Sequence, residues 1–371
     1  MQPHLRIFLF PLAACLLAAE SPKALLVPGD GRMEWKEKRD ALTFLWERAL
    51  GLPTTAGKVG HQDVPRSEVL EGFLASDFKG TLMRQRTAGD AWQRILLMEP
   101  LNLKGRTAGV LVPFYDSDRM CGYDLKTKQR LGPERNTAFF GLHLVRQGYV
   151  VAAVEAYPYN LLTPEERAAS KGGMGVWRAA AAKLAKQHPR LTGMGRLTED
   201  TRLAAEVLRG SDKVDPERIG IMGHSLGGKM AFYAGCLDSR FRAIVASDFG
   251  LAWDSSNWGD PWYFGDKLKG MRAQGLSHEQ LLAVGSKPFF LIAGQYDSQA
   301  SAGPLLEEAR KVRALQGQGD SLVMYDHHAG HQPTWPALKA AYVWLAGQLA
   351  MPPPDFAYLD QLAEEQAKVG K

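Results

Sequence analysis

The sequence has little cysteine and no long apolar run. Only three of its 371 residues are cysteine, so a framework of several disulfides is excluded. One of them, Cys15, lies near the N-terminus, and spacing alone cannot show whether Cys121 and Cys236 are close enough to pair. The apolar stretch at residues 7–19 is too short to span a membrane, and no later stretch reaches that length. A chain of this length can instead bury a core that is stable without covalent links.

The sequence also has little excess of either positive or negative charge. The 45 Lys and Arg residues are balanced by 40 Asp and Glu residues, which leaves a net charge of +5. The basic residues are scattered, and no dense basic run with interleaved aromatic residues is present, as nucleic-acid binding would require. We therefore expect a mixed, solvated surface and no nucleic-acid partner.

Residues 1–21 have the features of an export signal. A weakly basic start precedes a short apolar core at residues 7–12. The sequence Leu-Ala-Ala-Cys at residues 12–15 resembles the bacterial lipobox, whose cysteine is lipidated after cleavage. The alternative is ordinary cleavage near residues 18–19, where small side chains cluster. We expect an exported bacterial protein, either periplasmic or secreted, or an outer-membrane lipoprotein whose only link to the membrane is a lipid on Cys15.

Residues 22–371 are expected to form one domain with an N-terminal extension at residues 22–68. A helical period predicts a helix at residues 33–50, and β-rich runs between residues 69 and 100 predict a leading antiparallel hairpin. Strand candidates follow at residues 107–113, 149–154, 219–224, 243–247, 288–294 and 321–325, and helix candidates at 134–147, 176–187, 198–209, 229–237, 304–315 and 335–349. This alternation predicts an α/β fold with a mostly parallel sheet that helices cover on both faces.

The most informative stretch is Gly-His-Ser-Leu-Gly at residues 223–227. An apolar strand candidate precedes it and a helix candidate follows it, and this context around Gly-x-Ser-x-Gly is that of a nucleophile elbow. Glycine is needed on both sides of Ser225, because the strand and helix backbones nearly touch there. The N–H of Leu226, at the start of the helix, can face a developing oxyanion. The pattern predicts that Ser225 is a nucleophile; the alternative is a Gly/Ser turn between two core elements.

A serine nucleophile needs an imidazole to accept its proton and a carboxylate to orient that imidazole. In this kind of fold the order along the chain is Ser, then Asp or Glu, then His, each after a strand. Asp297 follows the strand candidate at residues 288–294, so we expect it to be the catalytic acid; the alternative is a turn or helix-capping aspartate. Asp320 and Asp326 are weaker candidates, because the first precedes the last strand and the second adjoins the histidines.

Three histidines, His327, His328 and His331, follow the last strand candidate. His331 lies on a loop after Gly330 and just ahead of a helix, so we expect it to be the base, with His328 as the next choice. Together with Asp326 these histidines are also ligand types for zinc. No further ligand cluster supports a metal, and the serine already accounts for one histidine. We therefore expect neither a metal nor another cofactor.

The oxyanion of a tetrahedral intermediate needs a second N–H donor besides that of Leu226. In this kind of fold the donor lies on the loop after an early central strand. Phe114 and Tyr115 follow the strand candidate at residues 107–113, so we expect the backbone N–H of one of them to be that donor. Their side chains can equally be ordinary packing.

With these residues placed, the chain resembles the α/β-hydrolase superfamily over most of residues 69–350. Within it, residues 214–229 are similar to the corresponding stretch of dienelactone hydrolase-like and acetyl xylan esterase-like exported bacterial hydrolases, and of glucuronoyl esterase-like relatives. The segments at residues 112–116 and 257–263 also look like parts of this group.

The resemblance implies that Ser225 is the nucleophile, Asp297 the acid and His331 the base. It departs from dienelactone hydrolase itself, whose nucleophile is a cysteine, so lactone chemistry is not implied. It also departs from acetyl xylan esterases at the oxyanion loop, where His-Gly is usual and Pro113-Phe114 stands here. The second departure weakens the oxyanion assignment more than the triad.

Aromatic residues follow two of the strand candidates. Aromatic faces stack on sugar rings, so we expect these side chains to bind substrate; the alternative is that they close the core beneath an insertion. The expected substrate-binding residues are Trp253, Trp258, Trp262 and Tyr157. Export, this aromatic loop and the resemblance together predict a serine esterase that acts on a small-molecule or glycan ester of the acetyl xylan type.

Two other functions stay open. A serine peptidase of the same fold has to hold an extended peptide, and no propeller-length extension or acidic pair for an N-terminal amine is visible in the sequence. A non-catalytic binding protein on a hydrolase scaffold usually lacks a member of the triad, and none is missing here.

Overall fold

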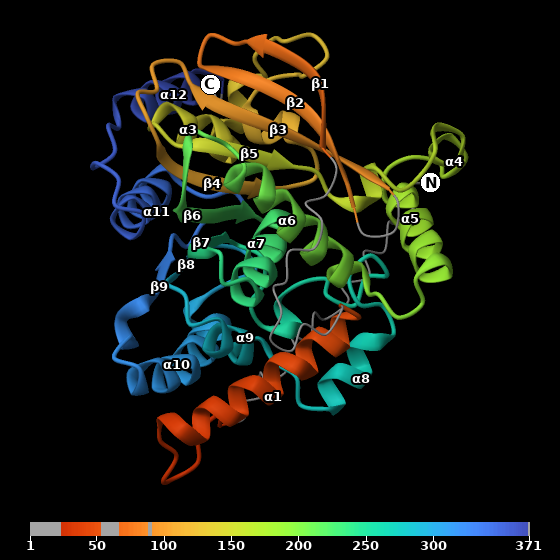
Figure 1. Cartoon of the computed structure of the whole chain (residues 1–371), viewed down its shortest axis with the longest axis vertical. Helices are drawn as coiled ribbons and strands as arrows, with labels where there is room; N and C mark the ends of the chain where they lie inside the picture. The colour runs from red at the N-terminus through yellow and green to blue at the C-terminus, as the bar shows by residue number, and fades with distance from the viewer. Residues whose placement is uncertain (1–23, 53–66, 88–90, 370–371) are drawn as a thin grey trace, which may run out of the picture.

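The computed structural model describes residues 24–52, 67–87 and 91–369. The export signal predicted for residues 1–21, with Cys15, lies outside the described residues. Within these ranges nine strands form the centre: β1 (Ser67–Leu74), β2 (Phe78–Arg86), β3 (Trp92–Pro100), β4 (Thr107–Pro113), β5 (Val150–Val154), β6 (Val214–His224), β7 (Phe241–Ser247), β8 (Phe289–Ala293) and β9 (Leu322–Asp326). They form one sheet in the order β1-β2-β3-β5-β4-β6-β7-β8-β9, which runs from β1 at the top of Figure 1 down to β9 at its left side.

The sheet is antiparallel at one end and parallel over the rest. β1, β2 and β3 pair antiparallel, as the predicted leading hairpin requires, and β3 is also antiparallel to β5. The six strands β4 to β9 run parallel to one another. The prediction of a mostly parallel sheet is confirmed. Because the carboxyl ends of parallel strands meet at one edge, loops at that edge can combine into a site.

Helices cover both faces of the sheet (Figure 1). Helices on one face include α5 (Met174–Gln187), α6 (Gly193–Arg209), α7 (Leu226–Leu237), α9 (His278–Gly285) and α10 (Gln299–Leu315). Helices on the other include α2 (Ser117–Cys121), α3 (Phe140–Arg146), α11 (Trp335–Gln348) and α12 (Ala357–Val369). Along β5 the side chains alternate: Val150 and Val154 pack under the first group, and Val151 and Ala153 under the second. A strand buried on both faces needs this continuous apolar run.

The predicted helix of the N-terminal extension is confirmed as α1 (Arg32–Leu50). It lies against α9, where the buried Trp46 donates its indole N–H to the Oε1 of Gln280 at 3.1 Å. The described part of the extension therefore packs on a helix that covers the sheet. None of the helices in the described ranges is both long and apolar enough to cross a membrane.

Several element boundaries differ from the prediction, and two examples have a clear structural cause. The helix predicted at residues 134–147 is divided into a 3-10 helix, η1 (Pro133–Ala138), and α3. Phe139 separates them, because its ψ of 54° is not helical and its ring is fully buried in the core. Residues 214–217, which precede the strand predicted at 219–224, also belong to β6, whose register against β4 shifts there.

Candidate active site

The elbow around Ser225 lies at the carboxyl end of β6, in the middle of the parallel strands. β6 ends at His224 and α7 begins at Leu226, so Ser225 is the only residue between strand and helix. Its φ of 55° and ψ of −115° are unfavourable for a residue with a Cβ, so the surrounding structure must hold it in place. The N–H of Ser225 donates to the carbonyl oxygen of Ser247 at 2.8 Å, which ties the elbow to the end of β7.

Close backbone contacts explain the two motif glycines. A Cβ at Gly223 would lie 2.0 Å from the carbonyl oxygen of Gly227, and a Cβ at Gly227 would lie 2.0 Å from the carbonyl oxygen of Pro113. The opposing atoms are backbone and cannot rotate away, so no side chain fits at either position. The second contact also brings the end of β4 against the elbow.

Gly227→Ala is expected to lower the free energy of unfolding by about 3 kcal/mol, because the added methyl group overlaps the backbone of β4. Urea unfolding followed by circular dichroism measures the change. Gly270→Ala is the matched control: Gly270 is exposed in α8 (Lys267–Ala273), and no atom lies within 4 Å of its added Cβ. The control should leave stability unchanged or raise it by about 1 kcal/mol. Equal stability of the two variants would contradict the packing described for the elbow.

Ser225, His331 and Asp248 form a continuous chain of hydrogen-bonding distances. The Nε2 of His331 lies 2.8 Å from the Oγ of Ser225, and its Nδ1 lies 2.6 Å from the Oδ2 of Asp248. The His331 side chain is 30% exposed, whereas that of Asp248 is 0% exposed, so a substrate can reach the imidazole but not the carboxylate. An imidazole that donates its Nδ1–H to a carboxylate presents the lone pair of Nε2 to the serine hydroxyl.

Asp248 is held as an ionised group at the end of β7. Its Oδ1 accepts the backbone N–H groups of Tyr296 at 2.7 Å and of Asp297 at 3.1 Å. Burial alone would raise the pKa of Asp248, but the hydrogen bonds from His331 and from these two N–H groups outweigh it and hold the pKa below its usual 3.8. The carboxylate therefore stays charged beside the imidazole.

Asp297 does not contact His331, contrary to the prediction. Its carboxylate is fully buried and accepts three backbone N–H groups of the loop after β7. The structure places Asp248 in the position expected for Asp297, one strand earlier in the chain.

The rule that selected Asp297 from the sequence fits Asp248 equally well. Asp248 directly follows the strand candidate at residues 243–247, just as Asp297 follows the next one, so both satisfy the order Ser, Asp, His. Chain order cannot choose between carboxylates on neighbouring strands. The choice depends on which side chain points to His331, and that is decided only in three dimensions.

Solved structures of known proteins share this architecture at low sequence identity. A candidate acetyl xylan esterase from Bacteroides fragilis NCTC 9343 is 15% identical, with a TM-score of 0.64 over 83% of this chain and 79% of that one. A glucuronoyl esterase from Solibacter usitatus is 15% identical, with a TM-score of 0.60 over 86% of this chain and 94% of that one. A CE15 glucuronoyl esterase from Teredinibacter turnerae T7901 is 18% identical, with a TM-score of 0.60 over 86% of both chains.

The chain has the α/β-hydrolase fold. The sequence profile of the prolyl oligopeptidase family, which shares this fold, matches residues 190–347. That segment contains Ser225, Asp248 and His331, whereas β1 to β5 lie outside it. Among curated protein sequences, none matches the chain.

A second histidine packs beside His331. The ring centroid of His224 lies 4.6 Å from that of His331, and its Nδ1 lies 3.1 Å from the Oγ of Ser247. Burial lowers the pKa of His224 to about 3, so the ring stays neutral and adds no charge next to His331.

The other two histidines of the predicted group point elsewhere. His328 is 81% exposed and its Nδ1 lies 3.1 Å from the Oδ1 of Asp326, while the Nδ1 of His327 accepts the N–H of Ala329. Neither is hydrogen-bonded to Ser225. Across the part of the chain that the structure describes, no group of three or more His, Cys, Asp or Glu side chains is arranged to hold a metal ion.

One of the predicted oxyanion donors is unsuitable. The N–H of Phe114 donates to the carbonyl oxygen of Val154 at 3.1 Å, so that part of the prediction is wrong. Within the described ranges, the N–H groups of Leu226 and Tyr115 make no hydrogen bond. They lie at the start of α7 and just beyond the end of β4, which meet at Gly227, and they remain the predicted pair.

The burial of the aromatic residues contradicts most of the predicted substrate contacts. Trp258 and Tyr157 are fully buried, and their indole N–H and hydroxyl donate to backbone carbonyl groups. Trp262 is 4% exposed, and the partly buried Trp253 packs its ring 3.9 Å from that of the buried His278. These side chains close the core between the loops, which was the alternative interpretation.

Other aromatic side chains lie closer to Ser225 and His331. The ring of the half-buried Tyr296 lies 4.8 Å from that of His331. Tyr115, also half-buried, packs 5.3 Å from Trp177 and 6.5 Å from Tyr159. The sequence did not predict Tyr296 as a neighbour of His331, because its only signal was its place beside Asp297.

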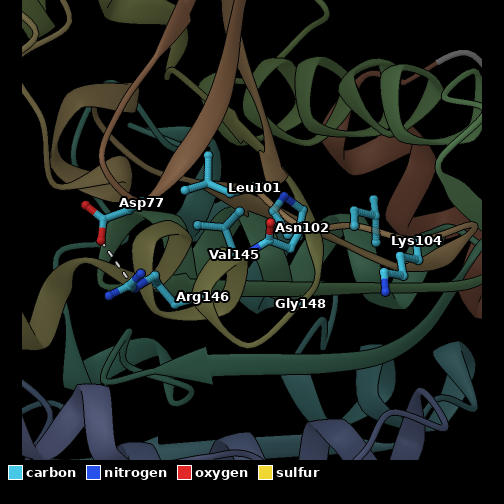
Figure 2. A pocket seen from close by; sticks show the side chains of 9 residues that line it. Asp77, Leu101, Asn102, Lys104, Val145, Arg146 and Gly148 are labelled. Atoms are coloured by element: carbon cyan, nitrogen blue, oxygen red, sulfur yellow. Dashed lines mark ion pairs between the residues drawn. The ribbon is translucent and has the colours of Figure 1, made fainter.

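The cavity in Figure 2 is not part of this site. Its volume is about 320 Å³, and the Asp77–Arg146 ion pair, at 3.2 Å, lies on its wall. Residues 101–104 of its lining precede β4 and Gly148 precedes β5, so it lies at the amino ends of the parallel strands. Ser225 follows the carboxyl end of β6, at the opposite edge of the sheet.

Proposed function

We propose that this chain is a serine hydrolase that cleaves carboxylic esters through an acyl-enzyme. The observation that carries the proposal is the chain of hydrogen bonds from Ser225 through His331 to the buried Asp248, with distances of 2.8 and 2.6 Å. The elbow geometry and the order of the three residues support it, because they match what acyl transfer by a serine needs.

In this mechanism the Nε2 of His331 takes the proton of Ser225 as its Oγ attacks the ester carbonyl carbon. The Nδ1–H remains donated to Asp248, whose charge stabilises the imidazolium. The N–H groups of Leu226 and Tyr115 donate hydrogen bonds to the carbonyl oxygen as negative charge develops on it. His331 then returns the proton to the departing alcohol, and the same groups activate water to release the acid.

We further propose that the ester belongs to a carbohydrate. The structural relatives named above are a candidate acetyl xylan esterase and glucuronoyl esterases by description. Two half-buried rings offer faces on which a sugar can stack: Tyr296, 4.8 Å from the ring of His331, and Tyr115, just after the end of β4 that meets Gly227. The glycan contact thus moves from the tryptophans proposed from the sequence to these tyrosines.

A panel of substrates tests this proposal. The purified chain is assayed on acetylated xylan, on the methyl ester of glucuronic acid and on nitrophenyl acetate, with Ser225→Ala as the blank. Release of acetate or methanol from a sugar ester at a higher kcat/KM than hydrolysis of nitrophenyl acetate supports the proposal. Activity on the nitrophenyl ester alone rejects the carbohydrate part and retains the esterase part.

A peptidase is the second candidate, because the profile of the prolyl oligopeptidase family matches residues 190–347. An esterase and a peptidase of this fold would use the same serine and histidine, so their substrates have to distinguish them. Dipeptidyl nitroanilides test for the peptidase. Cleavage of such an amide at a rate comparable with ester hydrolysis would replace the esterase by the peptidase.

We also propose that residues 1–21 direct export and that Cys15 carries a lipid. Cells that express the full chain are grown with radioactive palmitate, and the label is expected on the wild type and not on Cys15→Ser. An unlabelled wild type rejects the lipid and leaves cleavage near residues 18–19 as the alternative.

A further inference from the structure

The loop that carries Asp248 is hydrogen-bonded on one side to the side chain of Asp297. Residues 248–251, here called the acid loop, present three consecutive N–H groups to this buried carboxylate. Its Oδ2 accepts those of Phe249 at 3.0 Å and Gly250 at 2.9 Å, and its Oδ1 accepts that of Leu251 at 2.6 Å. Because both oxygens are used, the carboxylate fixes the direction of the loop as well as its distance.

Lys229 is hydrogen-bonded to the acid loop on its other side. Its Nζ donates to the carbonyl oxygen of Phe249 at 2.5 Å and to the Oγ of Ser256 at 2.7 Å, and it lies 4.2 Å from the centre of the Trp258 ring. Phe249, the residue after Asp248, is therefore bound at its N–H by an anion and at its carbonyl by a cation. Lys229 comes one helical turn after Ser225 on α7, so it also joins the loop to the nucleophile's helix.

The contact between the two aspartates is reciprocal. The side chain of Asp297 holds the backbone after Asp248, and the backbone N–H of Asp297 donates to the side chain of Asp248 at 3.1 Å. Asp248 has a φ of 41°, a left-handed conformation that is costly for a residue other than glycine. This conformation persists only if contacts on both sides hold it, and it directs the carboxylate to His331.

We propose that Asp297 and Lys229 are positioning residues that hold the acid loop so that Asp248 stays hydrogen-bonded to the Nδ1 of His331. The inference rests on the proposed serine mechanism and assigns it two further residues. Neither touches a reacting atom: Asp297 is 0% and Lys229 2% exposed, so no substrate reaches them. They act through Asp248 alone.

The burial of both charges is consistent with this role. Burial raises the pKa of Asp297 to about 6, against the pull of the N–H groups of Leu251 and Gly250, and it lowers the pKa of Lys229 to about 7. Burying two charges costs stability that an apolar pair would not lose. What the charges supply is strong, directed hydrogen bonds to four backbone groups of the acid loop.

The test replaces each charge by a side chain of similar size, in Asp297→Asn and Lys229→Met. We expect kcat for a simple ester to fall about 10- to 100-fold with KM within about twofold, because a small displacement of Asp248 misaligns the imidazole without touching the substrate. The acid limb of kcat/KM should move to lower pH, because the imidazolium loses part of its stabilisation by Asp248. Partial unfolding would lower kcat without moving that limb.

Two further measurements separate positioning from direct catalysis. Added to Asp248→Asn, the Asp297→Asn change should cost less than about twofold more, since it acts only through the group already lost. In proton NMR, the resonance of the His331 Nδ1–H, shifted far downfield by its bond to Asp248, should be lost or moved in Asp297→Asn and Lys229→Met.

The matched control is Asp200→Asn, another fully buried carboxylate, which pairs with Arg196 at 2.7 Å on α6 and does not contact the acid loop. It should alter stability but neither the pH profile nor the NMR resonance. Rates are expressed per serine labelled by a fluorophosphonate, so misfolded molecules are not counted.

Unchanged kcat and an unchanged resonance in both variants overturn the inference, and so does a full additive loss in the double variant. If instead Ser225→Ala retains activity, the serine mechanism itself fails, which is a distinct result.

Discussion

Replacement of Ser225 by alanine is expected to lower kcat/KM for any ester substrate by on the order of 10⁴-fold or more. The side-chain oxygen that attacks the carbonyl is removed, and His331 has no other nucleophile at 2.8 Å. The remaining rate is what the oxyanion donors and substrate binding provide on their own. Steady-state hydrolysis of nitrophenyl acetate by the purified variant measures the effect.

The fold of Ser225→Ala should be retained. The serine Oγ is at the surface of the site rather than in the core, and alanine meets the same backbone demand at φ 55°. The circular dichroism spectrum and the thermal midpoint should therefore match the wild type within a few degrees. Hydrolysis at the wild-type rate by a correctly folded Ser225→Ala protein would refute the serine mechanism.

Asp248→Asn is expected to have the second-largest effect, a loss in kcat on the order of 10³- to 10⁴-fold. An amide at this position cannot stabilise the imidazolium, and its NH₂ group favours the histidine tautomer that carries the proton on Nε2. That tautomer cannot accept the proton of Ser225. KM should change little, because Asp248 is buried away from the substrate.

Comparison of the two aspartates gives this prediction its control. Asp297→Asn removes a carboxylate of the same type, equally buried and one strand further along, but one that binds backbone N–H groups rather than His331. It should cost at least tenfold less than Asp248→Asn. A larger loss for Asp297→Asn would restore the assignment made from the sequence and contradict the geometry.

Much of the fold was predictable because its signals are local. The apolar runs of β4, β5, β7 and β8 are long enough to be recognised as buried strands, and their alternation with helices allows few arrangements other than a parallel sheet. Ser225 was equally predictable, because an added Cβ at either motif glycine would lie only 2.0 Å from a backbone oxygen, in the motif itself for Gly223 and in the neighbouring strand for Gly227. Because these local constraints require glycine at fixed positions, they can be recognised in the sequence as a motif.

The remaining features depend on contacts between distant segments. Asp248 and Asp297 both follow strands, and only the strained backbone of Asp248 directs one of them to His331. The tryptophans after β7 have the composition of a sugar-binding loop, yet Trp258 is buried against the N-terminal half of α7, beneath Lys229. Composition gives the side chains that are available but not the face on which they lie.

The most direct test of the central claim is the rate at which a fluorophosphonate labels the chain, with the modified residue mapped by mass spectrometry of the tryptic peptide at residues 219–229. A serine activated by His331 and Asp248 predicts a single label on Ser225, absent in Ser225→Ala. It also predicts that labelling slows far more in Asp248→Asn than in Asp297→Asn. No label on Ser225 of the folded wild type, or equal slowing by the two aspartate variants, would contradict the account.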